Sequence, residues 1–228
     1  MAEGRIARNI AVVRERISQS CERAGRSAES VTLVAVSKNV PAKSILAASE
    51  VGVGDFGESY VQEANAKICD PIFAHSGIRW HFIGHIQSNK VRQIVGKFEL
   101  IHSVDSVALA AEIGRRSALQ DIRSRLLLEV RLDTESPKHG FLPADLDEAV
   151  ERVVHLPGVE LLGLMGMPPF SERAEESRPH FRGLKALFDR LPKSCREILS
   201  MGMSGDFEVA IEEGATHVRV GTAIFGSR

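Results

Sequence analysis

Eight short apolar runs, separated by longer amphipathic segments, constrain the fold of this chain more than any other feature of its sequence. The runs span residues 31–37, 52–58, 78–84, 99–105, 125–132, 159–166, 197–203 and 217–226. Each has the length of a buried strand, and most of the segments between them have the apolar spacing of a crossover helix. Eight strand and helix repeats within 228 residues predict an α/β fold, a single (β/α)8 TIM barrel, with a doubly wound open sheet as the main alternative.

The first 26 residues precede this alternation and predict an extra N-terminal helix packed on the barrel. Their apolar residues recur at helical spacing: Ile6, Ile10, Val13 and Ile17. No linker divides the rest, so we expect residues 1–228 to form one domain. Serines predict several helix starts. Ser59 with Gln62 has the form of a capping box, and three more serines precede helical periodicity, namely Ser88, Ser106 and Ser204.

Composition narrows the possible partners. The formal net charge of -1 and the pI of about 6.7 favour neither nucleic acid nor an anionic membrane surface. No segment reaches the roughly 20 apolar residues of a membrane span, and the N-terminus lacks the apolar core of a signal peptide. Cys21, Cys69 and Cys195 are odd in number and lack the spacing of metal ligands, so we expect free thiols in a cytoplasmic protein without structural zinc.

Polar residues gather where the predicted strands end, and in a barrel those ends meet at one mouth. Gly202, Ser204 and Gly205 lie at the end of the seventh run, just before a predicted helix, and Gly221 with Thr222 lies in the eighth run. Loops after the seventh and eighth strands often bind phosphate through backbone N–H groups. Glycines in tight turns and a serine acting as an N-cap would explain the same pattern.

Two basic residues complete this group. Arg219 lies within an alternating strand, where a buried guanidinium needs an acceptor; Glu58, Asp206, Glu208 or a ligand could supply one. Lys38 ends the apolar run VTLVAVS. It is either a surface lysine or an amine that desolvation keeps neutral and able to attack a carbonyl as a Schiff-base former. Beside a phosphate cradle and an arginine, the second interpretation suggests a phosphorylated aldehyde such as pyridoxal 5′-phosphate (PLP).

Long motifs resemble the pyridoxal phosphate homeostasis protein family over nearly the whole chain: VAVSKNVP, FGESYVQEA, WHFIGHIQSNK, IHSVDS, LLGLMGM and LSMGMSGDFEVAIEEGATHVRVGTAIFG. The resemblance implies a barrel of the alanine racemase N-terminal-domain type and PLP as cofactor. It implies that Lys38 forms the Schiff base and that Arg219 faces the pyridine nitrogen. It also implies further cofactor-binding positions: Ser204, Gly221 and Thr222 at the phosphate, and Met165 and Met201 along the pocket.

The chain departs from the family pattern in two places. Ser59 stands where the family usually has an asparagine near the cofactor, so a direct contact from the shorter side chain is in question. In the loop RLDTESPKHG, Arg131 takes another asparagine position, whereas Glu135, Lys138 and Gly140 are kept. Both changes predict an altered rim around the bound cofactor.

A metal site is a weaker interpretation. His81 and His85 are four residues apart, but the segment has the character of a strand end, and a zinc pair at this spacing needs a helix.

The resemblance also bears on activity. An arginine at the pyridine nitrogen argues against transaminase chemistry but not against racemisation, for which alanine racemases use a tyrosine of a separate domain as second base. The chain ends just past the barrel, and its only tyrosine, Tyr60, belongs to a barrel motif. We therefore expect a monomeric homeostasis protein without turnover that holds PLP and is able to deliver it to PLP-dependent apo-enzymes. The alternatives are a weak amino-acid racemase or other one-base PLP enzyme, and a Schiff-base aldolase.

Overall fold

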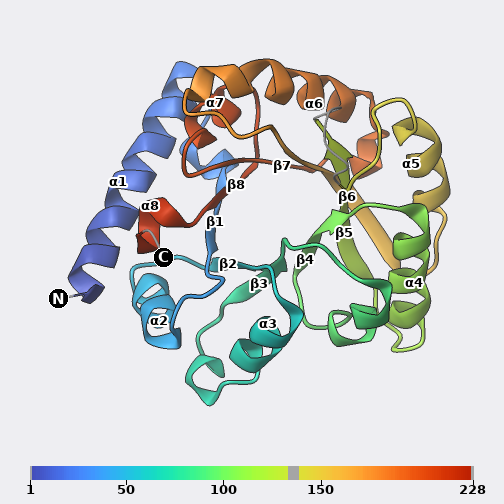
Figure 1. The fold of residues 1–228 in the computed structure, drawn as a ribbon, viewed down its shortest axis with the longest axis horizontal. Helices are drawn as coiled ribbons and strands as arrows, with labels where there is room; N and C mark the ends of the chain where they lie inside the picture. The colour runs from blue at the N-terminus through green and yellow to red at the C-terminus, as the bar shows by residue number, and fades with distance from the viewer. Residues whose placement is uncertain (1, 133–138, 227–228) are drawn as a thin grey trace.

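Eight parallel strands close into a barrel in the computed structural model, which describes residues 2–132 and 139–226 (Figure 1). The strands are β1 (Thr32–Val36), β2 (Asp55–Glu58), β3 (Arg79–Phe82), β4 (Leu100–Val104), β5 (Ser124–Arg131), β6 (Val159–Met167), β7 (Ile198–Met203) and β8 (His217–Val220). Strand β1 pairs with β8 through Thr32 opposite His217, which closes the ring. The predicted (β/α)8 barrel is confirmed, and the open sheet is excluded.

Helices surround the strands on the outside of the ring (Figure 1). The α-helices are α1 (Ala2–Arg23), α2 (Ala42–Glu50), α3 (Val61–Ile68), α4 (Val107–Ala118), α5 (Leu146–Val154), α6 (Arg178–Arg190), α7 (Phe207–Glu212) and α8 (Thr222–Phe225). Short 3-10 helices are η1 (Ala28–Ser30), η2 (Pro71–Phe73), η3 (Ser88–Gln93), η4 (Ala174–Ser177) and η5 (Lys193–Cys195). Within the described ranges, no helix has the length and apolar character needed to cross a membrane.

The predicted N-terminal helix is α1, and it packs against α2, α7 and α8. Its four regularly spaced apolar residues are all buried: Ile6, Ile10, Val13 and Ile17. The side-chain amide of Asn9 also donates a 2.8 Å hydrogen bond to the carbonyl oxygen of Ile224 in α8. Helix α1 therefore holds the segment that follows the last strand.

Local structure differs from the sequence-based prediction at two connections. The eighth strand ends at Val220, and residues 222–225 form α8, because the ladder to β1 stops at Val220 and the N–H groups beyond it turn into a helix. The segment after β3 forms the 3-10 helix η3 rather than an α-helix. Gly96 follows it at a φ of 78°, so the chain reverses within a short connector, where 3-10 geometry is common.

Only one of the predicted serine caps forms in the described structure. Ser106 Oγ accepts a hydrogen bond from the N–H of Leu109 and caps α4. Ser59 does not cap α3, which begins after Tyr60 without a side-chain cap. Ser88 lies inside η3, and Ser204 lies two residues before the N-cap of α7, Asp206. The capping box fails because Ser59 is one residue too early for the helix that follows.

The barrel interior holds charged side chains at its amino-terminal end. Asp55, on β2, accepts hydrogen bonds of 2.8 and 2.6 Å from Arg79 and a contact of 2.9 Å from His81. Burial raises the pKa of Asp55, but these hydrogen bonds outweigh it and lower the pKa from 3.8 to about 2. Asp55 is only 7% exposed, so its ionised form is held by protein partners rather than by water.

We expect Asp55→Asn to lower the free energy of unfolding by about 2 kcal/mol at neutral pH, since a pKa lowered on folding stabilises the folded state above the unfolded-state pKa. The loss shrinks as the pH falls from about 5 towards 2, because wild-type Asp55 then becomes protonated. Urea denaturation across this range measures it, with the exposed Asp189→Asn as control. A difference independent of pH would contradict the assignment.

Candidate cofactor site at the carboxyl ends of the strands

A network behind Lys38 fixes the turn that carries it. Lys67 Nζ donates hydrogen bonds to Ser37 O, Glu58 Oε1 and Glu63 Oε1 at 2.7, 2.8 and 2.7 Å. Ser37 Oγ donates to Glu58 Oε1 at 2.6 Å, and the N–H of Asn39 donates to Glu63 at 2.6 Å. The two residues that flank Lys38 are therefore tied to β2 and α3.

Glu58 makes this network sensitive to substitution. Its side chain is fully buried, and Oε2 has no hydrogen-bond partner among the described residues. Burial raises the pKa of the carboxyl, although Lys67 and Ser37 donate to it. The carboxylate depends on Lys67 for its compensating charge.

We expect Lys67→Met to lower the free energy of unfolding by about 3 kcal/mol, because removing one partner of a buried ion pair leaves the other charge uncompensated. The double variant Lys67→Met, Glu58→Met should recover most of the loss, since an apolar pair can replace a buried ion pair. Urea denaturation measures both, with Lys185→Met, which breaks a surface pair, as control. If the stability losses of the two single variants simply add in the double variant, Lys67 and Glu58 do not form the described ion pair.

The side chain of Lys38 lies at a cavity rather than in this network. It is half-buried and, as far as the described residues extend, has no hydrogen-bond or ion-pair partner. It lines a cavity of about 350 Å³ at the carboxyl ends of the strands, together with residues from β7 and β8 and from the loops after β6, β7 and β8. The cavity brings four predicted site residues to Lys38: Ser204, Arg219, Gly221 and Thr222.

The loops after β7 and β8 meet at Ser204. Its hydroxyl oxygen accepts hydrogen bonds from the N–H groups of Gly221 and Ala223, at 3.2 and 3.3 Å. Two backbone donors thus converge on one oxygen position at the cavity wall. A Cβ atom built on Gly205, beside it, would meet no atom within 4 Å. The arrangement offers donors and space to an anionic oxygen group.

Arg219 lies at the base of this cavity and is 4% exposed. Its Nη1 donates to Ser200 Oγ at 2.6 Å and its Nη2 to the carbonyl oxygen of Gly166 at 3.1 Å. Burial lowers its pKa to about 10, while Glu129 and Asp206 act in the opposite direction. The guanidinium therefore remains charged at neutral pH.

The carboxylates predicted as partners of Arg219 bind elsewhere. Glu58 pairs with Lys67, and Glu208 pairs with Arg16 of α1 at 2.7 Å. Asp206 accepts from the N–H of Met203 at 2.6 Å and shapes the loop that carries Ser204. Glu58 and Glu208 face the helices that surround the barrel, which is why neither reaches the interior.

Three predicted cofactor-binding residues lie away from this cavity. Met201 has no exposed surface and belongs to the core between strands and helices, because alternation on β7 points its neighbour Ser200 inward. Met165 lies in the apolar cluster inside the barrel with Leu100 and Ile198. Met203 lines the cavity instead. Ser59 lines a separate surface cavity with Tyr60 and His85.

Sequence reasoning did not identify Glu129, a buried residue of β5. Burial and the nearby Asp105 raise its pKa to about 7, with Arg219 opposing them. It lines a neighbouring cavity of about 480 Å³ that shares Phe170 and Met203 with the first. A carboxylate within the otherwise apolar run LLLEV was the available signal.

The two histidines considered for metal binding are separated. His81 lies in the barrel interior, whereas His85 and His139 each place Nδ1 3.3 Å from Asp105 Oδ2 at the barrel mouth. The rings of His85 and His139 stack at 3.6 Å with an interplanar angle of 19°. Because a metal ion lies in the plane of each imidazole that binds it, these stacked rings do not present both nitrogens to one ion.

The loop after β5 lies partly outside the described residues, including Glu135 and Lys138. Gly140 is described and has a φ of 115°. Arg131 lines the cavity of Glu129, and its Nε is buried without a hydrogen-bond partner among the described residues. The predicted change at the rim thus falls beside the second cavity.

Comparisons with known proteins cover nearly the whole chain and agree on its family. Residues 4–228 match the family alanine racemase, N-terminal domain. The pyridoxal phosphate homeostasis protein of Aquifex aeolicus is 45% identical over 219 residues, which cover 95% of each chain. The structure of PipY from Synechococcus elongatus PCC7942 with PLP bound is 37% identical, with a TM-score of 0.81, and the match covers 97% of this chain and 100% of that one.

An alanine racemase of Clostridium difficile shares the fold alone, with 14% identity and a TM-score of 0.72 over 57% of its length. The similarity in sequence to the Aquifex aeolicus protein thus covers nearly the whole barrel. The chain therefore belongs to the pyridoxal phosphate homeostasis protein family, and it matches the alanine racemase N-terminal domain.

Proposed function

We propose that this protein binds PLP at the mouth of the barrel and acts in intracellular PLP and amino-acid homeostasis. One observation carries the proposal: Lys38, the donors at Ser204 and Gly221, and Arg219 line a single cavity. An amine, an anion cradle and a charged donor match the aldehyde, the phosphate and the pyridine nitrogen of PLP. PipY, which is 37% identical over nearly the whole chain, has a structure with PLP bound.

PLP supplies an aldehyde that forms a Schiff base with an amine. Lys38 is the proposed amine, and the network of Lys67 and Glu58 holds its turn in place. The N–H groups of Gly221 and Ala223, which now meet Ser204 Oγ, are the proposed donors to the phosphate together with the residues Ser204 and Thr222. Arg219 is the proposed donor to the pyridine nitrogen and, being charged at neutral pH, would keep that nitrogen unprotonated.

We further propose that the protein holds PLP without turnover, as a cytoplasmic monomer able to deliver the cofactor to apo-enzymes. An arginine at the pyridine nitrogen weakens the electron-withdrawing power of the ring. Tyr60, 53% exposed, lies at the start of α3 and lines a different cavity from Lys38. The free cysteines Cys21, Cys69 and Cys195 are compatible with a reducing compartment.

A racemase-type activity is the second candidate, and the cavity beside the first favours it. Glu129, with a pKa of about 7, and His85 and His139 line that cavity. A carboxyl group poised near neutrality suits general acid–base catalysis. It would have to act on the face of the cofactor opposite Lys38.

A titration with PLP and with pyridoxal, which lacks the phosphate, tests the proposed binding. We expect an absorption band in the visible range with PLP and much weaker binding of pyridoxal, because only PLP reaches the cradle. A protein that remains colourless with PLP would contradict the proposed PLP site. The Schiff-base aldolase would then be the remaining hypothesis for Lys38. Equal affinity for PLP and pyridoxal would contradict the assignment of a phosphate site at Ser204 and Gly221.

Exchange of the α-proton of L-amino acids in deuterated water distinguishes a protein that only binds PLP from a PLP-dependent enzyme. Without turnover, PLP-loaded protein exchanges at most about one equivalent. Sustained exchange that disappears in Glu129→Gln, while PLP stays bound, would establish the racemase-type candidate instead.

A further inference from the structure

A continuous chain of buried polar side chains crosses the barrel interior from β2 to β8. Its links are Asp55 to His81 at 2.9 Å, His81 to His102 at 2.9 Å, His102 to Ser200 at 2.8 Å and Ser200 to Arg219 at 2.6 Å. None of the five residues is more than 7% exposed. Barrel interiors are usually filled by branched apolar residues, so a polar chain here requires an explanation.

The chemistry of each end limits how protons can be arranged. Asp55 has a pKa of about 2 and therefore only accepts, so Nε2 of His81 is a donor. Arg219 only donates, so Ser200 Oγ is an acceptor from Nη1. Burial, together with the neighbouring His81, His217 and Arg219, lowers the pKa of His102 well below its usual range. His102 is therefore neutral and has one N–H.

One arrangement satisfies every group. If His102 donates from Nε2 to Nδ1 of His81, its Nδ1 accepts the hydroxyl proton of Ser200, and Ser200 accepts from Arg219. If His102 instead carries its proton on Nδ1, Ser200 Oγ faces two donors, and its own proton has no acceptor among the described residues. An unsatisfied buried group is costly. Every donor thus points from Arg219 towards Asp55.

The order of donors and acceptors in the hydrogen-bond chain matters because Arg219 has no carboxylate within ion-pair distance in the described structure. Its two contacts are neutral acceptors, Ser200 Oγ and the carbonyl oxygen of Gly166. A buried guanidinium held by neutral groups needs compensation from polarised partners. The ionised Asp55 orients the hydrogen bonds that reach Arg219.

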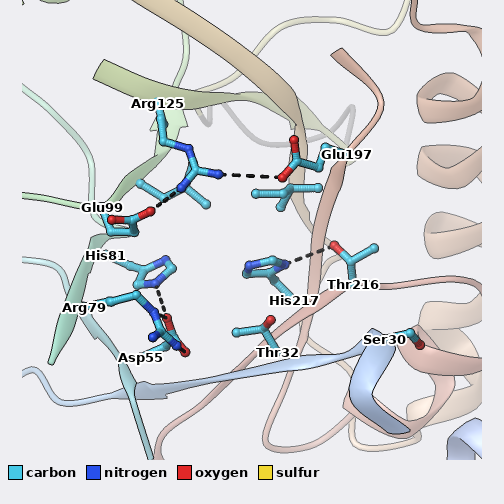
Figure 2. Close-up of a pocket in the computed structure, with 12 residues that line it drawn as sticks. Ser30, Thr32, Asp55, Arg79, His81, Glu99, Arg125, Glu197, Thr216 and His217 are labelled. Atoms are coloured by element: carbon cyan, nitrogen blue, oxygen red, sulfur yellow. Dashed lines mark hydrogen bonds and ion pairs between the residues drawn. The ribbon is translucent and has the colours of Figure 1, made fainter. Parts of the chain in front are cut away.

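The Asp55 end of the hydrogen-bond chain lies at a further cavity, of about 320 Å³, at the amino-terminal ends of the strands. Figure 2 shows Asp55 hydrogen-bonded to His81, with His217 on the opposite side. The other charged residues that line it are Arg79, Glu99, Arg125 and Glu197. The chain therefore connects the charged groups of one barrel end with the proposed cofactor site at the other.

We propose that Ser200, His102, His81 and Asp55 are positioning residues for Arg219: their one-directional hydrogen-bond chain fixes the guanidinium that faces the cofactor ring. The inference rests on the proposed function for the identity of the cofactor. The order of the chain can be measured without any cofactor.

The first experiment observes the histidines directly. Two-dimensional NMR of protein labelled with 15N-histidine distinguishes protons on Nδ1 from protons on Nε2. We expect a proton on Nε2 and none on Nδ1 of both His81 and His102, assigned with His81→Gln and His102→Gln. A proton on Nδ1 of His102 in the wild-type protein would overturn the proposed order. In Asp55→Asn we expect the Nε2–H form of His81 to lose its dominance, because an amide can donate as well as accept.

The second experiment follows the cofactor. Ser200→Ala should shift the absorption maximum of bound PLP and weaken PLP binding about tenfold, the effect of losing one hydrogen bond to a charged group. Asp55→Asn should shift the absorption band in the same direction, although three residues lie between Asp55 and Arg219 in the hydrogen-bond chain. The 15N chemical shift of the pyridine nitrogen in labelled PLP reports the same change at the atom that Arg219 faces.

Ser124→Ala is the matched control, since it also removes a buried strand hydroxyl, whose partner is Ser117. It should leave the band and the affinity unchanged. If Ser200→Ala and Asp55→Asn behave like Ser124→Ala while the wild type binds PLP, the positioning role is refuted. If the wild type does not bind PLP, the proposed function fails, and the NMR measurement still decides the order of the chain.

Discussion

Lys38→Ala should abolish covalent capture of PLP. We expect borohydride reduction of the wild-type protein with one equivalent of PLP to place a single pyridoxyl group on Lys38, and the variant to acquire none. The reason is local: Lys38 lines the cavity with Arg219 and Ser204, and it has no competing partner among the described residues. Peptide mapping by mass spectrometry measures the label.

Lys43→Ala is the control for this experiment, because Lys43 is exposed on α2, five residues away. It should take up the label as the wild type does. The phosphate cradle does not depend on Lys38, so the variant should still bind PLP reversibly. A pyridoxyl group on another lysine of the wild type would overturn the assignment of Lys38.

Gly202→Ala should destabilise the protein about as much as Lys67→Met, although it removes no ion pair. Gly202 has a φ of 91°, and a Cβ atom there would lie 2.6 Å from Ala210 Cβ and 2.9 Å from Phe207 Cα. Strain in the backbone and a clash with α7 together cost about 3 kcal/mol. For a chain of this size we expect a fall of about 10 °C in Tm, measured by circular dichroism.

Gly205→Ala, three residues later, is the matched comparison. A Cβ atom at Gly205 meets nothing within 4 Å, so the variant should melt with the wild type. Both glycines flank Ser204 in one motif, but we expect only Gly202 to support the packing of β7 on α7. Equal melting of the two variants would contradict this division.

Much of the fold could be predicted from the sequence because each strand is buried on both faces and forms a nearly continuous apolar run. The ends of elements were harder to predict. The run through residues 217–226 remains apolar where the chain leaves the sheet for α8, since the same residues pack equally well from a helix. Likewise, Val91 and Ile94 are buried from a 3-10 helix and the turn after it, and apolar spacing does not separate this geometry from an α-helix.

The site divides in the same way. Lys38, Ser204, Arg219 and Gly221 could be grouped because parallel strands bring their carboxyl ends together, and the structure places them in one cavity. Partners inside the barrel depend on which strands face each other across it. The contact between Ser200 and His102, 98 residues apart in the chain, has no local signal. Met201 lies in the core between the strands and the helices, which could not be predicted because a motif does not state which face of the strand each residue occupies.

Closure of the barrel by β1 and β8 has a consequence for synthesis on the ribosome. Lys38 follows the first strand, whereas Arg219, Ser204 and Gly221 come from the last two strands and the loops after them. Asn9 of α1 also bonds to Ile224, 215 residues later. Contacts at such separations form only after most of the chain has been made. A nascent chain therefore carries Lys38 long before it carries the residues of the proposed phosphate site, so we expect selective uptake of PLP to begin only once these residues have been made.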